Sequence, residues 1–183
     1  MACSYEESVE SCNVNLVNDE KLEETYRPND DAIQIVDNGR ACEKIRLSAY
    51  GCALGKHSYH SGIHCIRLRV CGHGVVFGIR SRNILPVPDD YAWGRYDSGP
   101  STYGWTRDDG RISNGKFAKR NLETMNRDEH VFALTLNCDK HRLSVLDENT
   151  KEKDELKIDI LHAPLPWCLF IQLSRFRSRV SLV

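Results

Sequence analysis

The sequence predicts an all-β fold, a sandwich of two antiparallel sheets. From Ile33 onward, no window of helical length shows a sustained apolar period of 3.6 residues. Short β-branched and aromatic runs recur instead, separated by Gly, Asn, Asp and Pro, at a spacing typical of two-sheet sandwiches. The 183 residues, of which 40% are hydrophobic, suffice for one domain with a core of its own.

Ten segments are expected to form strands, because each holds alternating or consecutive large apolar residues between turn-forming residues. In chain order they are residues 32–37, 44–50, 62–70, 75–81, 111–115, 130–138, 142–148, 156–160, 167–174 and 178–183. The last segment runs to Val183 with no polar tail, so we expect it to be part of a sheet.

The stretch SGIHCIRLRV, residues 61–70, shows the alternation of an extended strand. One face would carry His64, Ile66, Leu68 and Val70, and the other Ile63, Cys65, Arg67 and Arg69. The first face is mostly apolar and the second carries the arginines. We therefore expect the first face to turn toward the core.

The stretch LTLNCDKHRLSV, residues 134–145, predicts a hairpin, because the turn-forming CDKH separates two alternating runs. Leu134 and Leu136 would share a face with Leu143 and Val145. The nearby GHGVVFG, residues 72–78, lacks the following helix of a phosphate-binding loop, so its glycines are expected to shape a turn and let strands approach closely. Core positions are expected for Tyr103, Trp105 and Trp167.

Residues 1–31 differ in composition from the rest of the chain. They hold nine acidic and two basic residues and few large apolar ones, and they end in RPNDDA. We expect residues 1–31 to be an acidic, mostly disordered arm and residues 32–183 to be one domain. The basic residues of that domain are dispersed among acids, which argues against a nucleic-acid partner.

Cysteine usage and hydropathy indicate the compartment. The eight cysteines are scattered and several lie inside apolar runs, which is typical of reduced thiols. No run approaches the ~18 apolar residues of a membrane span, and the start lacks the pattern of a signal peptide. We expect a cytoplasmic protein without a membrane partner.

Four segments in order resemble the SPRY (B30.2) family, as found at the C-terminus of tripartite-motif proteins. SGIHCIRLRV with VVFGIRS is similar to the Gly-x-His strand and to the strand that follows it in the family. YGWTRDDGRISNGK, DEHVFALTLNCDKHRLSVLDENT and APLPWCLFIQLSRFRSRVSLV follow in the family's order, so the resemblance covers residues 33–183. Divergence is visible at Cys65 and Ile66, where the family has an aromatic pair, and at Arg67 and Arg69, where it has acids.

The resemblance implies a bent, jelly-roll-like sandwich that recognises a protein or peptide through loops at one edge. It also implies that the chain is not an enzyme and needs no cofactor. The long segment 81–105 suits this function, since it holds three prolines and five aromatic residues. Aromatic and arginine side chains contribute most per residue at protein interfaces. The predicted partner-binding residues are Tyr91, Trp93, Arg95 and Tyr96, with Arg80 and Arg82 as a charged rim.

Two other classes of function stay open. A carbohydrate-binding lectin shares the sandwich architecture, although the galectin sugar-binding motif is absent. A zinc or thiol enzyme is suggested by Cys138 near His141 and by a group of possible zinc ligands, which are His57, His60, His64, Cys65, Cys71 and His73. The turn-like HSG at residues 60–62 argues against convergence of these ligands, and adjacent strand residues face opposite sides. We therefore predict no metal site.

Overall fold

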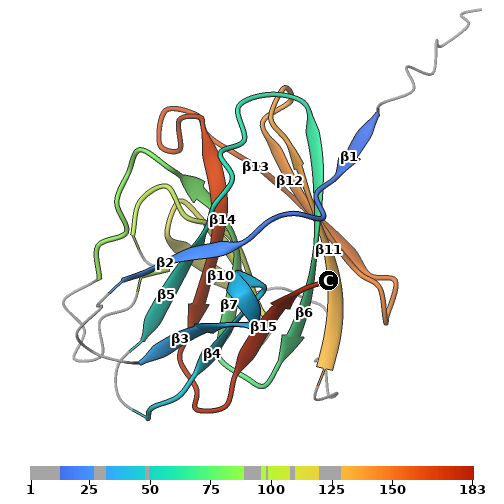
Figure 1. The fold of residues 1–183 in the computed structure, drawn as a ribbon. Helices are drawn as coiled ribbons and strands as arrows, with labels where there is room; N and C mark the ends of the chain where they lie inside the picture. Colours follow the sequence, from blue (N-terminus) through green and yellow to red (C-terminus); the bar gives the residue numbers. More distant parts are fainter. Residues whose placement is uncertain are drawn as a thin grey trace, which may run out of the picture.

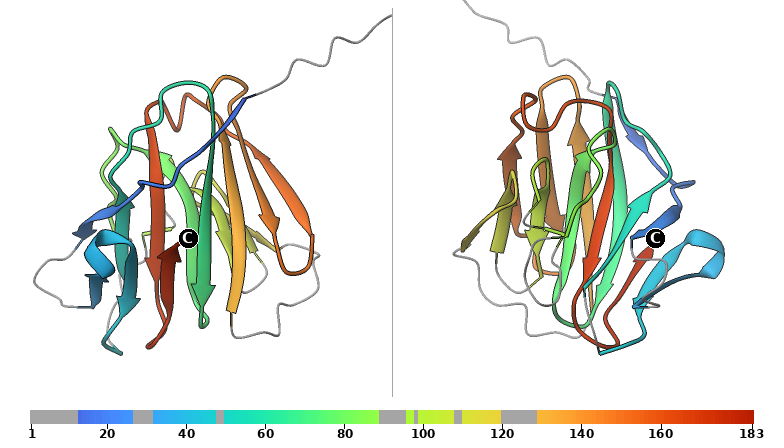
Figure 2. Two further views of the ribbon diagram at one scale, coloured as in Figure 1. Left: turned by 45° about the vertical axis from the view of Figure 1, so that its right-hand side comes forward. Right: turned by 90° about the vertical axis from the view of Figure 1, so that its left-hand side faces the viewer.

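The computed structural model describes residues 13–26, 32–47, 50–88, 96–97, 99–107, 110–119 and 129–183. Two β-sheets lie face to face (Figures 1 and 2), and the described residues otherwise contain one short 3-10 turn, Asp37–Gly39. The predicted all-β sandwich of two antiparallel sheets is confirmed.

The first sheet has eight strands. Seven lie side by side in the order β13 (Lys153–Lys157), β12 (Arg142–Asp147), β11 (Glu129–Asn137), β6 (Ile63–Cys71), β15 (Arg179–Leu182), β4 (Ala41–Lys44) and β3 (Ile33–Val36). The eighth, β1 (Val14–Leu16), pairs in parallel with the start of β6. The predicted place of the C-terminal segment in a sheet is confirmed by β15, which pairs with both β6 and β4.

The second sheet has seven strands. Their order is β10 (Lys116–Lys119), β9 (Gly110–Ser113), β8 (Tyr103–Thr106), β7 (Val75–Ser81), β14 (Trp167–Leu173), β5 (Gly51–Gly55) and β2 (Leu22–Tyr26). All of the described pairs in this sheet are antiparallel.

The core fills the space between the two sheets. In β6, Ile66, Leu68 and Val70 are buried whereas Arg69 is exposed, which confirms the predicted alternation. The hairpin of β11 and β12 has the predicted register, with Leu134 opposite Val145 and Leu136 opposite Leu143. The predicted core aromatics Tyr103, Trp105 and Trp167 are all buried.

Two glycines face one another where β7 and β8 pair. Gly78 lies opposite Gly104, and a Cβ on Gly78 would meet the carbonyl oxygen of Tyr103 at 2.1 Å. The close approach of strands predicted for Gly78 is therefore present. The same space limit applies to Gly104, whose Cβ would meet the carbonyl oxygen of Phe77 at 2.3 Å.

The strands expected at 44–50 and 156–160 are placed wrongly by the sequence. Lys44 ends β4, residues 45–47 lie outside any strand, and β5 begins only at Gly51. β4 (ACEK) begins with two small residues, and β5 (GCALG) consists mostly of small residues that pack closely: a Cβ on Gly51 would meet Ile33 at 2.2 Å. Further along, β13 covers Lys153–Lys157, and Asp159 instead accepts the backbone N–H of Leu161 in a turn.

The N-terminal region contradicts the expectation of a mostly disordered arm for residues 13–26. β1 joins the first sheet and β2 joins the second, so the expected domain boundary after residue 31 does not separate an arm from the sandwich. Between these strands Glu20 is fully buried and accepts the hydroxyl of Tyr59 at 2.5 Å and the backbone N–H of His57 at 3.0 Å. Buried hydrogen bonds thus hold a segment whose composition is typical of disorder. Residues 1–12 and 27–31 lie outside the described residues.

Candidate partner-binding site

The outer face of the second sheet carries its own apolar cluster. In β14, Leu169 and Ile171 point into the main core, whereas Cys168 and Phe170 point to the opposite side. In the connection between β7 and β8, Tyr96 lies against this outer face, because it is only 1% exposed and is part of the cluster. The residues that form it are Cys52, Leu54, Val76, Tyr96, Ile112, Cys168 and Phe170.

A glutamine in the sheet fixes the position of this segment. The Gln172 side chain is buried, and its Oε1 accepts the backbone N–H of Tyr96 at 2.6 Å and that of Asp97 at 3.0 Å. At the far end of β7, the Ser101 hydroxyl accepts the backbone N–H of Ser81 at 2.8 Å. Because buried polar groups are costly to leave without partners, these contacts hold the described residues Tyr96, Asp97 and Ser101 against the sheet.

The two arginines predicted as a charged rim bind backbone carbonyls of their own chain. Arg80 is buried and donates through Nε and Nη2 to the carbonyl of Ile84, at 3.2 and 2.9 Å. Arg82 donates to the carbonyls of Lys56 and His57 at 2.8 and 3.1 Å, and also to that of Gly55. Both therefore brace the start of the segment, and their contact with a partner stays a prediction.

Exposed apolar side chains follow directly after these arginines. Leu85 and Val87 are each 66% exposed, while Pro86 between them is buried. Of the other predicted contact residues, Tyr96 lies inside the apolar cluster, and Tyr91, Trp93 and Arg95 lie outside the described residues.

Sequence reasoning missed three features of this face. Leu85 and Val87 were visible as large apolar residues in the proline-rich run ILPVPDD, which is a usable signal. Gln172 was visible only as one polar residue in the run WCLFIQL, and nothing in the sequence says what it binds. Asp97 had no signal, because its role depends on a side chain 75 residues away.

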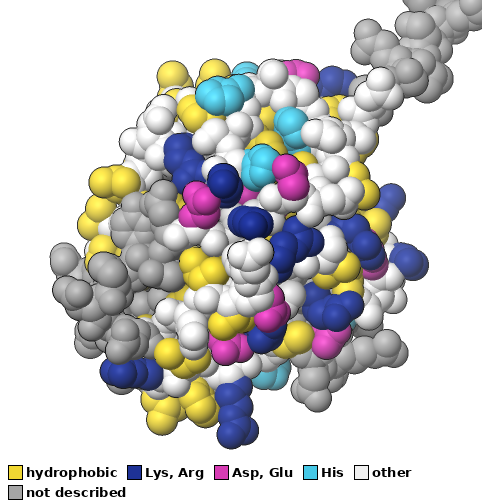
Figure 3. Space-filling model, in the orientation of Figure 1, with side chains coloured by type: hydrophobic (Ala, Val, Ile, Leu, Met, Phe, Trp, Pro, Cys, Tyr) yellow, Lys and Arg dark blue, Asp and Glu magenta, His cyan; other side chains and the backbone are white. Residues whose placement is uncertain are grey.

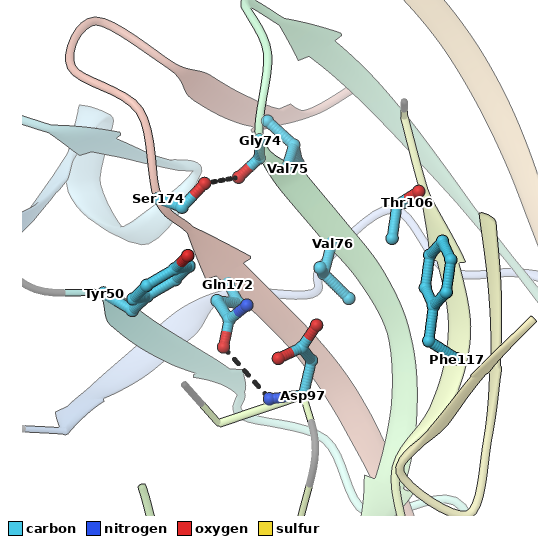
Figure 4. A pocket seen from close by; sticks show the side chains of 9 residues that line it. All are labelled: Tyr50, Gly74, Val75, Val76, Asp97, Thr106, Phe117, Gln172 and Ser174. Atoms are coloured by element: carbon cyan, nitrogen blue, oxygen red, sulfur yellow. Dashed lines mark hydrogen bonds between the residues drawn. The ribbon is translucent and has the colours of Figure 1, made fainter. Parts of the chain in front are cut away.

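A cavity of about 250 Å³ adjoins the segment on the same outer face. Figure 4 shows Tyr50 and Phe117 on its two sides, with Asp97, Gln172 and Val76 between them. Tyr50 directly precedes β5 and Phe117 belongs to β10, so the cavity extends across much of the sheet.

Charge on the surface is mixed in sign. In the face shown in Figure 3, Lys and Arg side chains lie interspersed with Asp and Glu. On the outer face of the first sheet, Arg67 pairs with Glu148 at 2.6 Å and Arg69 pairs with Glu129 at 3.1 Å. Each of these arginines is paired with an acid, so the two do not form the basic stripe that is typical of nucleic-acid binding.

The described residues give little support to a thiol enzyme or to a metal site. No three His, Cys, Asp or Glu side chains there lie close enough to hold a metal ion. Burial raises the pKa of Cys138 to about 11 and that of Cys42 to about 12, so both thiols are neutral at physiological pH. No described helix is long and apolar enough to cross a membrane.

Comparisons with known proteins give matches among solved structures. No protein-family model and no curated protein matches the chain. The TRIM65 PSpry domain matches with 12% identity and a TM-score of 0.68, over 92% of this chain and 90% of that one. The SPRY domain of human HERC1 matches with 12% identity and a TM-score of 0.63, over 82% and 93%.

Stonustoxin matches with 11% identity and a TM-score of 0.69, over 92% of this chain. This chain spans 27% of that stonustoxin chain, so the likeness concerns one part of the toxin. These likenesses show the fold, which is of the SPRY type, and they confirm the resemblance read from the sequence.

Proposed function

We propose that this SPRY-type chain is a protein-interaction module that binds a peptide or a folded partner on the outer face of its second sheet. The SPRY-type fold supports an interaction role in general. The observation that carries the proposed site is the exposure of Leu85 and Val87 on a segment that buried side chains hold in place.

Exposed apolar side chains next to anchored backbone favour binding for an entropic reason. A mobile loop loses conformational freedom when a partner orders it, and this loss weakens association. Here Arg80, Arg82 and Gln172 already hold the backbone on both sides of residues 85–95. Burial of these apolar side chains against a partner therefore lowers the free energy of binding, and less of that gain is lost in ordering the backbone.

The predicted contact residues extend this site along the same segment. Tyr91 or Trp93 would serve as the apolar anchor, because aromatic side chains bury a large area at low entropic cost. Arg95 would pair with an acid or a carbonyl of the partner. Arg80 and Arg82 would act mainly by positioning the segment.

The test is capture of partners from a cell extract by the full chain. Wild type is compared with Leu85→Asp/Val87→Asp and with Trp93→Ala, and Leu161→Asp serves as the matched control because Leu161 is 87% exposed at another site. Folding of each variant is checked by circular dichroism. Each protein captured is then purified and titrated against the same four chains.

The proposal predicts a partner that wild type and Leu161→Asp bind with equal affinity and that both segment variants lose. Equal binding by all four chains would place the site elsewhere. Failure of wild type to retain any protein above an unrelated β-sandwich domain would refute the interaction role.

A further inference from the structure

The outer edge of β10 is open and carries exposed side chains. Among the described strands, β10 is the last of the second sheet, and it pairs only with β9. We infer that this edge binds an extended, acidic segment of a partner protein, which adds a strand beside β10. The inference goes beyond the proposed function, because the edge is a different surface from the one that carries Leu85 and Val87.

The backbone of Phe117 provides hydrogen-bonding groups. Asn114 and Gly115 have positive φ, 50° and 73°, and form the two-residue turn between β9 and β10. Ser113 and Lys116 flank this turn and make the first hydrogen-bonded pair of the hairpin, and bonded and non-bonded pairs alternate from there. Phe117 comes next, in a non-bonded pair, so its N–H and C=O point away from β9. No hydrogen bond within the described chain uses either group.

The tip of this hairpin is fixed to the residues that precede β8. The side chain of Asn114 accepts the backbone N–H of Ser101 at 3.0 Å. Gly115 donates its N–H to the carbonyl of Thr102, also at 3.0 Å. The edge is therefore ordered before a partner arrives, and less free energy is lost in ordering it on binding.

The side chains of the hairpin set the kind of partner. Lys116 and Phe117 are exposed, Phe117 at 58%, so an added strand would cover apolar surface. Residues 110–119 contain three basic residues and no acid. Two of the three, Arg111 and Lys116, form no ion pair with a described residue. Acidic residues on the added strand would supply the opposite charge, since such pairs across strands are favourable.

A second copy of this chain fits the edge less well than an acidic segment does. Two β10 strands paired with each other would bring lysines of like charge together, which is destabilising. Lysines on an edge strand typically prevent this kind of self-association. The same lysines favour an acidic strand, so the edge discriminates between the two occupants.

The test titrates the full chain with short peptides and follows the backbone amides by NMR. The probe is an acetylated and amidated heptapeptide of alternating Glu and Val. A second peptide has Lys in place of each Glu, and a third is the probe with every backbone nitrogen methylated. We expect saturable shifts at Lys116, Phe117 and Ala118 with the probe alone, together with slower hydrogen exchange at the Phe117 amide.

Phe117→Pro tests the backbone contact. Proline lacks the N–H that points away from β9 and leaves the hydrogen bonds of the hairpin in place. Phe117→Ala is the matched control, because both variants lose the ring and only proline loses the N–H. We expect the probe to bind about tenfold more weakly to Phe117→Ala, for the lost apolar contact, and to give no saturable shift with Phe117→Pro.

Lys116→Gln tests the charge. We expect it to bind the probe about threefold more weakly than wild type does, as for the loss of one exposed ion pair. Lys140→Gln is the control and should bind as wild type does, because Lys140 is an exposed lysine in the turn between β11 and β12.

Each other outcome overturns the inference. Absence of saturable shifts in wild type would remove the site, and equal shifts with the lysine peptide would remove its preference for acids. Equal binding of the methylated peptide, or of the probe to Phe117→Pro and Phe117→Ala, would show that no strand is added. Protection of the Phe117 amide that rises with the concentration of the chain alone would identify a second copy as the occupant.

Two features of the design keep these outcomes separate. The methylated peptide is tested on wild type, so the conclusion about hydrogen bonding does not depend on the folding of Phe117→Pro. Partner capture depends on residues 85 and 87 and this titration does not, so the inference and the proposed function fail separately.

Discussion

Oε1 of Gln172 accepts the backbone N–H of Tyr96 at 2.6 Å, although the two residues are 76 positions apart in the sequence. One amide in the sheet thereby fixes the backbone at Tyr96, within the connection between β7 and β8. The same oxygen accepts the N–H of Asp97, which lines the cavity on this face. Gln172 therefore joins these two described residues of the connection to the sheet.

Replacing Gln172 with Met should loosen the segment while keeping its volume. The variant leaves the buried N–H groups of Tyr96 and Asp97 without their acceptor, and we expect a loss of about 2–4 kcal/mol in the free energy of unfolding. Urea denaturation measures this loss. Hydrogen exchange at these two amides should accelerate more than exchange in β11, and unchanged protection would show that other contacts hold the segment.

Replacing Tyr59 with Phe should weaken the attachment of the N-terminal strands. The variant removes the hydroxyl that Glu20 accepts at 2.5 Å and leaves a buried carboxylate oxygen without its partner, at a cost of about 2 kcal/mol. Limited proteolysis should then cut within residues 13–26 earlier than in wild type. Tyr103→Phe is the control, because its hydroxyl accepts a single long bond of 3.3 Å from Asp159. Equal losses in the two variants would contradict the importance of the Glu20 contact.

The sequence predicted those elements whose stability comes from alternating apolar side chains. The strand expected at 62–70 is β6 with its bounds shifted by one residue, and the hairpin of β11 and β12 has the predicted register. In these elements the pattern along the chain is itself the cause of the structure, because one face must be buried. The apolar pattern that determines such a strand therefore lies within one short stretch of the sequence.

The sequence could not predict contacts that depend on distant partners. β5 consists mostly of small residues, and β4 combines Ala and Cys with Glu and Lys, so neither carries a strong strand pattern. Glu20 has the same appearance as its exposed acidic neighbours, yet it is buried and hydrogen-bonded to Tyr59. The candidate site follows the same rule: the aromatic segment was visible in sequence, whereas Gln172 and the cavity required the structure.

Replacing Gly104 with Ala should destabilise the second sheet. The new Cβ would lie 2.3 Å from the carbonyl oxygen of Phe77 and 2.8 Å from Cα of Gly78. Both are backbone atoms that cannot rotate away, so we expect a cost of about 3 kcal/mol, at the upper end for overpacking. Gly99→Ala is the control, because its Cβ would meet nothing closer than 3.4 Å. Similar unfolding midpoints in urea for these two variants would contradict the close approach of β7 and β8.

The ion pair between Arg67 and Glu148 should make stability depend on acid pH. Nε and Nη2 of Arg67 donate to the two oxygens of Glu148 at 2.7 and 2.6 Å, and this hydrogen bonding lowers the pKa of Glu148 below its ordinary value of 4.5. A carboxyl with a lowered pKa in the folded state contributes stability above its unfolded pKa and loses that contribution as the pH falls through the folded pKa.

Glu148→Gln should therefore be less stable than wild type at neutral pH, with a difference that closes under acid conditions. Both side chains are partly exposed, at 38% and 27%, so solvent screening keeps the expected difference below about 1 kcal/mol. Urea denaturation at a series of pH values from 7 down to 3 measures it. Glu155→Gln removes a half-exposed pair with Arg142 and should change stability less. A gap between wild type and Glu148→Gln that stayed constant or widened toward low pH would show that packing, and not the charge of Glu148, sets the effect.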